Sequence, residues 1–344
     1  MLKPKLTICI ATYKRASFIR ETLDSILGQM RPGVELVLVD GASPDNTAEV
    51  VTEYVAKYPE LRYYRESENS GVDGDYDKAV GYANGEYCWL MTDDDLLHPG
   101  AINKVMDRLQ ERTDLVIVNA EVRSADFSIM LDERLIRLDG DKVYGAGDEE
   151  SMFLETAQGL SFIGCVVIRR EVWLARDCRS YYGSLFVHVG VIFQHAPIAR
   201  AALIAEPLIT IRYGNAMWTP RGMEIWIVKW PELIWSFMDF TDKSKSILCP
   251  RGGWHLVKRL MFYRATGAYT NKEYDEIVSK KFVGPTRMAS KLVAIIPVTF
   301  AGFIACMHSV FLGGRGSRMI AYSLNNGRHR NAVTSWAAKI AGVC

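Results

Sequence analysis

Paired cysteine motifs are absent from this sequence of 344 residues. Its seven cysteines are scattered, and no two of them form a Cys-x-x-Cys pair. Several lie inside apolar runs, where cysteine behaves as a small hydrophobic residue. The pattern excludes a redox motif of that kind, and we expect a reducing cytosol to suit the chain best.

An apolar leader is also lacking. The first five residues include two lysines and a proline, and the strand-like run after them soon gives way to polar residues. That run is too short for the apolar segment of a secretory signal. We therefore expect no export signal.

Acidic residues are missing from the last part of the chain. From Ile277 to Cys344 there are nine Lys or Arg and no Asp or Glu, whereas the preceding residues carry 32 basic and 40 acidic side chains. Leu292–Leu312 is 21 residues without a charge, interrupted by Pro297 and Gly302. This segment either spans a bilayer or forms a re-entrant or interfacial helix pair whose basic neighbours face anionic lipid. A C-terminal core helix of a soluble protein is the alternative, and the missing acidic residues argue against it.

Short apolar runs rich in β-branched residues alternate with segments of helical spacing over the first hundred residues. The predicted strands and helices are, in order, Leu6–Ala11, Phe18–Gln29, Val34–Asp40, Thr47–Lys57, Leu61–Arg65, Asp77–Ala83 and Tyr87–Met91. This β-α-β order implies an α/β fold with a Rossmann-like, mostly parallel sheet and helices on both faces. Further strands are expected at Leu115–Asn119 and Phe162–Arg169. Between Arg123 and Glu150 we expect loops, with a hairpin as the alternative.

Polar clusters follow three of the predicted strands. They are Thr12-Tyr13-Lys14-Arg15, Asp40-Gly41-Ala42-Ser43 and Thr92-Asp93-Asp94-Asp95. Ligands of parallel α/β sheets bind outside the carboxyl ends of the strands. We therefore expect these three clusters to meet in one site.

The cluster Thr92-Asp93-Asp94-Asp95 is the candidate metal site. Mg²⁺ and Mn²⁺ take oxygen ligands and keep coordination sites for phosphate oxygens. The carboxylates directly follow an apolar strand, where their charges would be costly without a counter-ion. An exposed acidic turn that caps a helix near Pro99 is the alternative reading.

Several motifs occur in an order and at a spacing that resemble the family 2 glycosyltransferases of the GT-A fold, over roughly residues 5 to 215. They are Thr7–Arg15, Val39–Thr47, Asn69–Gly71, Asn84–Tyr87 and Thr92–Asp95. Three further segments are similar to the abequosyltransferase-like branch of that family, which acts on lipid-linked O-antigen intermediates. They are Gly71–Asp77, Ser161–Cys165 and Phe186–Gly190.

The resemblance implies roles for residues of the three clusters. Ala11, Tyr13 and Arg15, with Thr12 beside them, would line the nucleotide, Asp40 would contact its base, Asp93 the ribose, and Asp94 or Asp95 the metal. The chain departs from the family at two positions. Gly41 replaces the second Asp of the usual Asp-Asp-Gly-Ser turn, and Thr92 replaces the first Asp of the usual metal motif. For Asp40, capping of the following turn is the alternative role.

Other polar residues are candidates for the donor side. Asp73, Asp75 and Asp77 alternate with other residues in a glycine-containing loop, which either is solvated or binds donor sugar hydroxyls. Arg212 and Arg221 flank a polar, aromatic loop at 214–219 and could grip phosphate in the bidentate manner of arginine.

Several residues are candidates for the catalytic base. Inverting members of the family place an acidic residue at the start of the helix near Phe186, where this chain has Val187-His188. His188 could deprotonate the acceptor, because the ordinary pKa of histidine suits general base work near neutral pH. The alternative is that His188 packs as a satisfied polar residue, which would leave Asp73, Asp75 or Asp77 as the base.

The resemblance implies an inverting, metal-dependent glycosyltransferase with Mn²⁺ or Mg²⁺ as cofactor. A nucleoside diphosphate sugar, with a deoxyhexose as one candidate, would be the donor, and a polyprenyl-diphosphate-linked or other glycan of O-antigen-like polysaccharide synthesis the acceptor. We expect a location at the cytoplasmic face of the inner membrane and no nucleic acid partner. Expected regions are a GT-A catalytic domain over residues 1–215, a Trp-rich helical acceptor-side region over 216–290, and a basic, hydrophobic, membrane-associating tail over 291–344.

Two rival functions remain open. A nucleotidyltransferase would need a glycine-rich phosphate loop after the first strand, and the loop that begins at Ala11 lacks those glycines. A sugar-nucleotide-binding protein of the same fold without turnover is the second rival, because the acidic base is missing.

Overall fold

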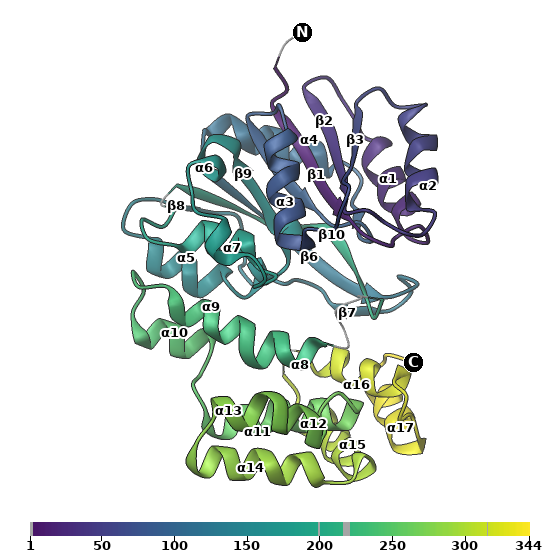
Figure 1. The fold of residues 1–344 in the computed structure, drawn as a ribbon, viewed down its shortest axis with the longest axis vertical. Coiled ribbons are helices and arrows are strands. Elements are labelled where there is room, and N and C mark those ends of the chain that lie inside the picture. The colour runs from purple at the N-terminus through teal and green to yellow at the C-terminus, as the bar shows by residue number, and fades with distance from the viewer. Residues whose placement is uncertain (1–2, 199, 216–220, 315) are drawn as a thin grey trace. The chain divides into compact units, whose positions relative to one another are not determined.

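The computed structural model describes residues 3–198, 200–215, 221–314 and 316–344. The chain forms two compact units (Figure 1). The first, here called the sheet unit, comprises Met1–Glu121, Glu133–Arg212 and Phe237–Ser244. The second, here called the helical unit, comprises Val122–Asp132, Tyr213–Ser236 and Lys245–Cys344.

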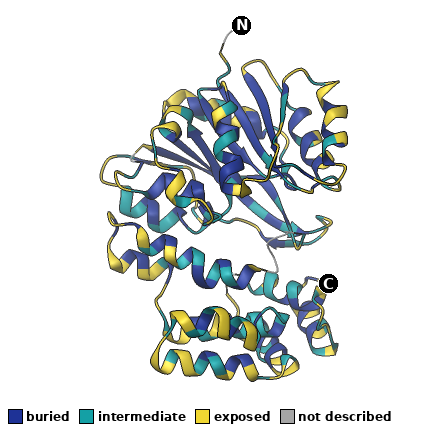
Figure 2. Ribbon diagram, viewed as in Figure 1, coloured by how far each residue is buried: buried dark blue, intermediate teal, exposed yellow. Residues whose placement is uncertain are grey.

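Four parallel strands form one half of the sheet, as predicted. They are β1 (Leu6–Thr12), β2 (Val34–Asp40), β3 (Leu61–Arg65) and β4 (Tyr87–Met91), in the order β3-β2-β1-β4. β2 and β4 are buried along their whole length (Figure 2), which is why they read as continuous apolar runs. Thr12 pairs with Asp40, and Ile10 pairs with Met91. The three polar clusters therefore begin at the same edge of the sheet.

The other half of the sheet contains antiparallel strand pairs, which the sequence did not predict. β9 (Val166–Arg169) runs antiparallel to β4 and to β6 (Leu115–Ser124), and the order continues β9-β6-β10-β5. The remaining strands are β5 (Leu96–Leu97), β7 (Met130–Asp132), β8 (Lys142–Tyr144) and β10 (Ala201–Tyr213). β7 pairs antiparallel with the end of β6 as a hairpin, the alternative that we kept for the stretch between Arg123 and Glu150, and β8 lies in the same stretch.

Helices cover the sheet, and α3 packs on β1 and β2. The α-helices of the sheet unit are α1 (Ile19–Leu27), α2 (Thr47–Val55), α3 (Gly71–Tyr82), α4 (Ala101–Arg108), α5 (Glu149–Thr156), α6 (Arg170–Leu174) and α7 (Val187–Phe193). α10 (Asp242–Leu248) starts in this unit, and short 3₁₀ turns span Leu109–Glu111, Gly159–Ser161, Ile163–Cys165 and Arg179–Tyr181. α1 buries Ile19, Leu23, Ile26 and Leu27, the residues whose spacing predicted it.

α3 begins six residues earlier than predicted, so the expected loop that carries Asp73 and Asp75 is helical. Gly71 takes a φ of +79°, which turns the chain into the helix. An acidic side chain in the first turn, here Asp73, is also favoured by the helix dipole. Because they lie on a helix and not on a loop, Asp73 and Asp75 project from defined positions of the backbone.

The helical unit joins the two regions that we had expected to be separate at residue 290. Its α-helices are α8 (Gly222–Glu224), α9 (Trp230–Ser236), α11 (Gly253–Thr266), α12 (Asn271–Glu273), α13 (Ser279–Lys281), α14 (Gly284–Ile295), α15 (Val298–Met307), α16 (Ser317–Asn326) and α17 (Ala332–Ile340). π-helical turns η6 (Ile225–Lys229), η7 (Tyr274–Val278) and η8 (His308–Leu312) connect some of them. Leu260 of α11 shares a buried cluster with Val293 of α14, and Ala265 shares another with Ala301 of α15. Buried side chains from both sides of residue 290 therefore pack together in these two clusters, and the boundary expected at 290 stays a prediction.

Among the described residues, no single helix is long and apolar enough to cross a membrane. α14 and the helix from Val298 to Leu312 meet these limits only as a pair, and the pair is bent by 109°.

Candidate active site

Hydrogen bonds join the loop after β1 to the loop after β2. The backbone N–H of Lys14 donates to Ser43 Oγ at 3.0 Å, and that of Arg15 donates to Thr47 Oγ1 at 3.0 Å. Lys14 and Ala42 are non-glycine residues with φ values of +58° and +60°. Such left-handed residues cost about 1–2 kcal/mol each and cluster at functional sites. Two of the three predicted clusters therefore form one rigid rim.

Arg15 connects this rim to the acidic cluster after β4. Its Nε lies 3.3 Å from Asp93 Oδ1, and its Nη2 lies 3.2 Å from Asp94 Oδ2. All three side chains are about nine-tenths buried. The structure thus brings the predicted nucleotide-lining residue and the predicted ribose and metal residues into direct contact.

Asp95 is held by hydrogen bonds within the protein. Its Oδ2 accepts from Thr92 Oγ1 at 2.5 Å, and its Oδ1 accepts from the backbone N–H of Arg212 at 2.7 Å. Thr22 Oγ1 donates to the backbone carbonyl of Asp95 at 2.9 Å. Asp95 therefore closes the acidic turn and ties it to β10 and α1, so Asp94 is the better placed of the two predicted metal ligands.

Arg212 reaches the same cluster from β10. Its Nε donates to the backbone carbonyl of Asp94 at 3.0 Å, and its Nη2 pairs with Glu21 Oε2 at 2.5 Å. The ring of Phe18 lies under both guanidinium groups, 5.6 Å from that of Arg15 and 5.3 Å from that of Arg212. Our sequence reasoning missed Phe18 and Glu21, although their i, i+3 spacing beside α1 was a usable signal.

Charge is unbalanced at the site, with four carboxylates (Asp93, Asp94, Asp95 and Glu21) around two guanidinium groups. Burial, with the nearby charge of Asp94, raises the pKa of Asp93 to about 7. Burial likewise raises the pKa of Asp95 well above its usual range. A bound cation would relieve both effects.

Hard oxygen ligands at this cluster fit Mg²⁺ or Mn²⁺. Among the described residues, no group of three or more His, Cys, Asp and Glu side chains converges as a complete cage. Mg²⁺ in phosphate-transfer sites commonly uses one or two carboxylates and takes its other ligands from substrate phosphates and water. Asp94 with Asp93 matches that open kind of site.

Asp40 has the position predicted for it at the end of β2, but it is fully buried. Its Oδ1 accepts from the backbone N–H of Ser43 at 2.8 Å, and its Oδ2 accepts from the Tyr63 hydroxyl at 2.8 Å. Burial and this carboxylate raise the pKa of Tyr63 well above its ordinary value. The capping role that we kept as the alternative is therefore present, and contact with a nucleotide base stays a prediction.

Asp73 anchors the segment that leads into α7. Its carboxylate accepts three backbone N–H groups, from Gly183 at 2.8 Å, Leu185 at 2.9 Å and Val187 at 3.0 Å. Leu185 has a left-handed φ of +72°. These bonds make Asp73 a structural residue, so its predicted use by the donor sugar or as the base is not supported.

Asp75 lies against the turn after β2. Its Oδ1 accepts from Ser70 Oγ at 2.5 Å, and its Oδ2 would be only 2.5 Å from a Cβ atom added to Gly41. Burial raises the pKa of Asp75. Gly41, which departs from the family pattern, therefore makes room for this carboxylate, and Asp75 belongs to the Asp40 side of the site.

Asp77 ties α3 to two neighbouring segments. Its Oδ1 accepts from Trp173 Nε1 at 2.8 Å, and its Oδ2 accepts from the Tyr182 hydroxyl at 2.7 Å. Both oxygens are used in this way, so the structure favours a structural role over the predicted catalytic one.

His188 lies in the first turn of α7 and is only 1% exposed. Its Nε2 lies 2.7 Å from the backbone carbonyl of Leu160, so Nε2 carries the proton and Nδ1 carries the lone pair. Nδ1 has no hydrogen-bond partner among the described residues. Burial lowers the pKa of His188 to about 4, which keeps the ring neutral.

The remaining predicted donor residues are divided between the two units. Ala11 and Thr12 end β1, and the Lys14 ammonium lies 5.0 Å from the ring centre of Tyr13. Arg221 lies in the helical unit, where its Nε pairs with Glu224 Oε2 at 3.1 Å. Most of the loop between Arg212 and Arg221, including Trp218, falls outside the described residues.

A polar cluster that we did not predict follows the acidic turn. His98 Nε2 lies 2.8 Å from Thr210 Oγ1, and Thr210 Oγ1 donates to Glu121 Oε1 at 2.9 Å. β5, which begins directly after Asp95, pairs with β10 and leads to His98. These three residues come from distant parts of the chain, so no local sequence signal joined them.

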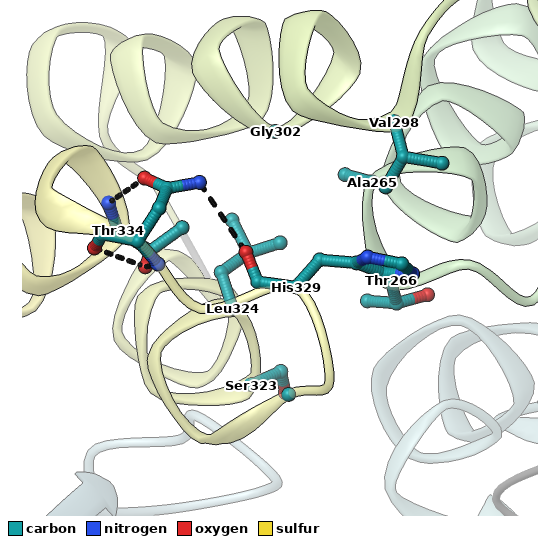
Figure 3. Close-up of a pocket in the computed structure, with 10 residues that line it drawn as sticks. Ala265, Thr266, Val298, Gly302, Ser323, Leu324, His329 and Thr334 are labelled. Carbon is teal, nitrogen blue, oxygen red and sulfur yellow. Dashed lines mark hydrogen bonds between the residues drawn. The ribbon is translucent and has the colours of Figure 1, made fainter.

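Two cavities lie away from this site. One of about 620 Å³ opens at the opposite edge of the sheet, beside Lys3, Gly85 and Arg169. Figure 3 shows the other, a cavity of about 10 Å³ inside the helical unit between His329, Thr334, Ala265 and Val298. That volume holds about one water molecule. Neither cavity contains any residue of the three predicted clusters.

The site is a buried acidic cluster with guanidinium counter-ions at the carboxyl ends of parallel strands, which is where α/β sheets bind their ligands. Residues 7–171 match the family model described as Glycosyl transferase family 2. Residues 7–171, just under half of the chain, therefore form a domain of the glycosyl transferase family 2 type. The family favours glycosyl transfer over the nucleotidyltransferase alternative.

The relatives of the chain include, by their names, a sugar transferase and a protein of teichoic acid biosynthesis. Abequosyltransferase RfbV of Salmonella typhimurium is 26% identical over 230 residues, which cover 63% of this chain and 69% of that protein. The minor teichoic acid biosynthesis protein GgaB of Bacillus subtilis is 28% identical over 107 residues, 30% of this chain and 12% of that protein.

Solved structures of S. aureus TarS 1-349 share the fold. The complex with UDP has a TM-score of 0.53 at 14% identity and covers 87% of this chain and 90% of that one. The complex with UDP-GlcNAc has a TM-score of 0.54 at 15% identity and covers 98% and 90%. The fold is therefore GT-A-like, with a helical extension after the catalytic-type domain.

Proposed function

We propose that this protein is an inverting glycosyltransferase that moves a sugar from a nucleoside diphosphate donor to a lipid-linked glycan at the cytoplasmic face of a membrane. The observation that carries the donor half is the contact of Arg15 with Asp93 and Asp94 where three strand ends meet. A buried cluster with excess negative charge needs a cation, and a nucleoside diphosphate with a divalent ion supplies one.

The names of the relatives support this choice of substrates. One relative is an abequosyltransferase, another takes part in teichoic acid synthesis, and TarS binds UDP and UDP-GlcNAc. All three are compatible with a nucleotide sugar as donor and a cell-surface polymer as acceptor. A deoxyhexose donor and a polyprenyl-diphosphate-linked acceptor are the finer form of the proposal.

Asp94, with Asp93 beside it, would hold the cation. When bound, Mn²⁺ or Mg²⁺ would neutralise the charge that grows on the leaving diphosphate. Arg15 would turn from the two carboxylates toward phosphate, since arginine grips both groups in the same bidentate way. Arg212 keeps the acidic turn in place through the carbonyl of Asp94 and the carboxylate of Asp95.

His188 is our candidate for the base that accepts the proton of the acceptor hydroxyl. It is neutral, and the lone pair on Nδ1 is unused by the described residues. Because the ring is buried, this role requires acceptor binding to uncover Nδ1. His188→Gln should then keep donor binding and lose turnover by about 100-fold, the lower end of what general base catalysis supplies.

Release of nucleoside diphosphate from a set of nucleotide sugars, in the presence of Mn²⁺, tests the proposal directly. We expect slow hydrolysis of one donor by the wild type and none by Asp94→Asn. Asp107→Asn, at an exposed position of α4, is the matched control and should hydrolyse the donor at the wild-type rate.

A binding protein without turnover is the second candidate, and the burial of His188 is the observation in its favour. Tight binding of a nucleotide sugar, together with no hydrolysis and no transfer to any lipid-linked acceptor, would establish it. Hydrolysis that depends on Asp94 would exclude it.

A further inference from the structure

Large apolar side chains are exposed along one face of α14. Met288, Leu292 and Ile295 are 72%, 60% and 56% exposed. Their i, i+4, i+7 spacing puts them on one side of the helix, whereas Val293 and Ala294 are buried in the core of the helical unit. The exposed residues therefore form one apolar face of a helix whose opposite face is packed in the core.

A second exposed group gathers where η8 meets α17. Phe311 and Leu312 are 72% and 76% exposed, and Trp336 and Ile340 are 41% and 53% exposed. The rings of Phe311 and Trp336 lie 6.4 Å apart, so the two segments share a continuous apolar patch. Trp336 and Ile340 follow an i, i+4 spacing on α17.

Basic side chains border these apolar faces. Arg287 on α14, Lys339 on α17, and Arg328 and Arg330 just before α17 are exposed. The sequence from Ile277 onward has no acidic side chain that could oppose them. Two other bases of this stretch pair with acidic side chains from earlier in the chain: the ammonium of Lys291 lies 3.5 Å from Asp275, and that of Lys281 pairs with Glu232.

We propose that the exposed apolar side chains of α14, η8 and α17, with these flanking bases, form a docking surface for an anionic lipid bilayer. Exposed apolar residues bordered by Lys and Arg are the pattern of helices that lie in the membrane interface. Tryptophan is enriched at that depth, and juxtamembrane bases are attracted by anionic headgroups. This step rests on the proposed function: if the protein is a glycosyltransferase for lipid-linked glycans, the surface would give it access to those acceptors.

Vesicle flotation with the full-length protein tests the proposal without any nucleotide or glycan. Vesicles of equal parts phosphatidylcholine and phosphatidylglycerol should carry the wild type upward. Pure phosphatidylcholine, or high salt, should weaken binding by about tenfold or more, because headgroup attraction is lost or screened.

Two variants separate the apolar and the charged contributions. Phe311→Ser with Leu312→Ser and Ile340→Ser should weaken binding to both kinds of vesicle. Arg328→Gln with Arg330→Gln and Lys339→Gln should weaken binding to the anionic vesicles alone.

The matched control carries serine at Val143 and Leu174, which are 57% and 51% exposed in the sheet unit. It should float like the wild type, and thermal melts should show that every variant is folded. Flotation of the triple serine variant at the wild-type level would overturn the proposal. So would absence of wild-type binding, or a wild-type dimer that the serine substitutions dissociate. Donor hydrolysis is measured separately, so failure of this surface and failure of the transferase proposal are distinguishable.

Discussion

At the scale of single residues, the site depends on Arg15 as the counter-ion of Asp93 and Asp94. Removing one partner of a buried pair leaves an uncompensated charge. Arg15→Gln should therefore lower the free energy of unfolding by about 3 kcal/mol, partly offset by protonation of Asp93. Urea unfolding checks this, and added Mn²⁺ should restore much of the loss. Equal stability of Arg15→Gln and wild type would show that the pair is not important.

His188 gives the protein a predictable acid sensitivity. Its folded pKa of about 4 lies below the ordinary value of 6.5, so folding favours the neutral ring. Stability from this residue is fully present above pH 6.5 and falls as the pH drops toward 4, by on the order of 3 kcal/mol. His188→Gln should show a flatter pH dependence of unfolding in that window. A slope identical to that of the wild type would contradict the buried neutral state.

Single-residue positions were predictable where the chain is locally informative. Arg15, Asp93 and Asp94 meet as expected, because strand ends of a parallel sheet share an edge, whereas Arg212 joins them from β10, which that argument did not include. The aspartates of α3 were predictable only as a group. Their partners, such as Gly183 and Trp173, come from about a hundred residues further along the chain.

At the scale of elements, Asp73 makes the start of α7 dependent on α3. Asp73→Ala removes the acceptor of three backbone N–H groups, and bonds to a charged group are worth about 1.5–3 kcal/mol each. We expect hydrogen exchange at Gly183, Leu185 and Val187 to speed up at least tenfold while β1 and β4 stay protected. Asp177→Ala, at a surface position bonded to Ser180, is the control. Unchanged exchange at these amides would remove the anchoring role.

Strand bounds were predicted well and strand direction only in part. β2, β3 and β4 begin and end at the predicted residues. β2 and β4 are buried strands that are mostly apolar and are followed by polar turns, which made their bounds easy to find. β9 was expected, but its antiparallel direction depends on long-range pairing with β4 and β6 that periodicity does not encode. α3 was predicted too late because its first turns are rich in Gly and Asp.

At the scale of the whole molecule, the basic tail shares two buried clusters with the helices before it, and this changes how the tail can be tested. Deleting residues 291–344 would remove Val293 and Ala301 from clusters that include Leu260 and Ala265. We expect that truncation to lower the melting temperature of the helical unit by more than 10 °C or to cause aggregation, since several buried apolar side chains cost about 2–5 kcal/mol each. Limited proteolysis within α11 would report the loss. A truncated protein that resists protease like the wild type would show that the tail is separable after all.

The central claim is that the acidic cluster after β4 binds a nucleoside diphosphate together with a divalent cation. A thermal-shift screen of UDP, CDP and GDP, with and without Mn²⁺, tests it most directly. We predict that one of the three raises the melting temperature of the wild type and of Asp107→Asn only when Mn²⁺ is present, and that Asp94→Asn abolishes the response. Metal-dependent stabilisation that persists in Asp94→Asn, or no stabilisation of the wild type by any of the three, would contradict the account.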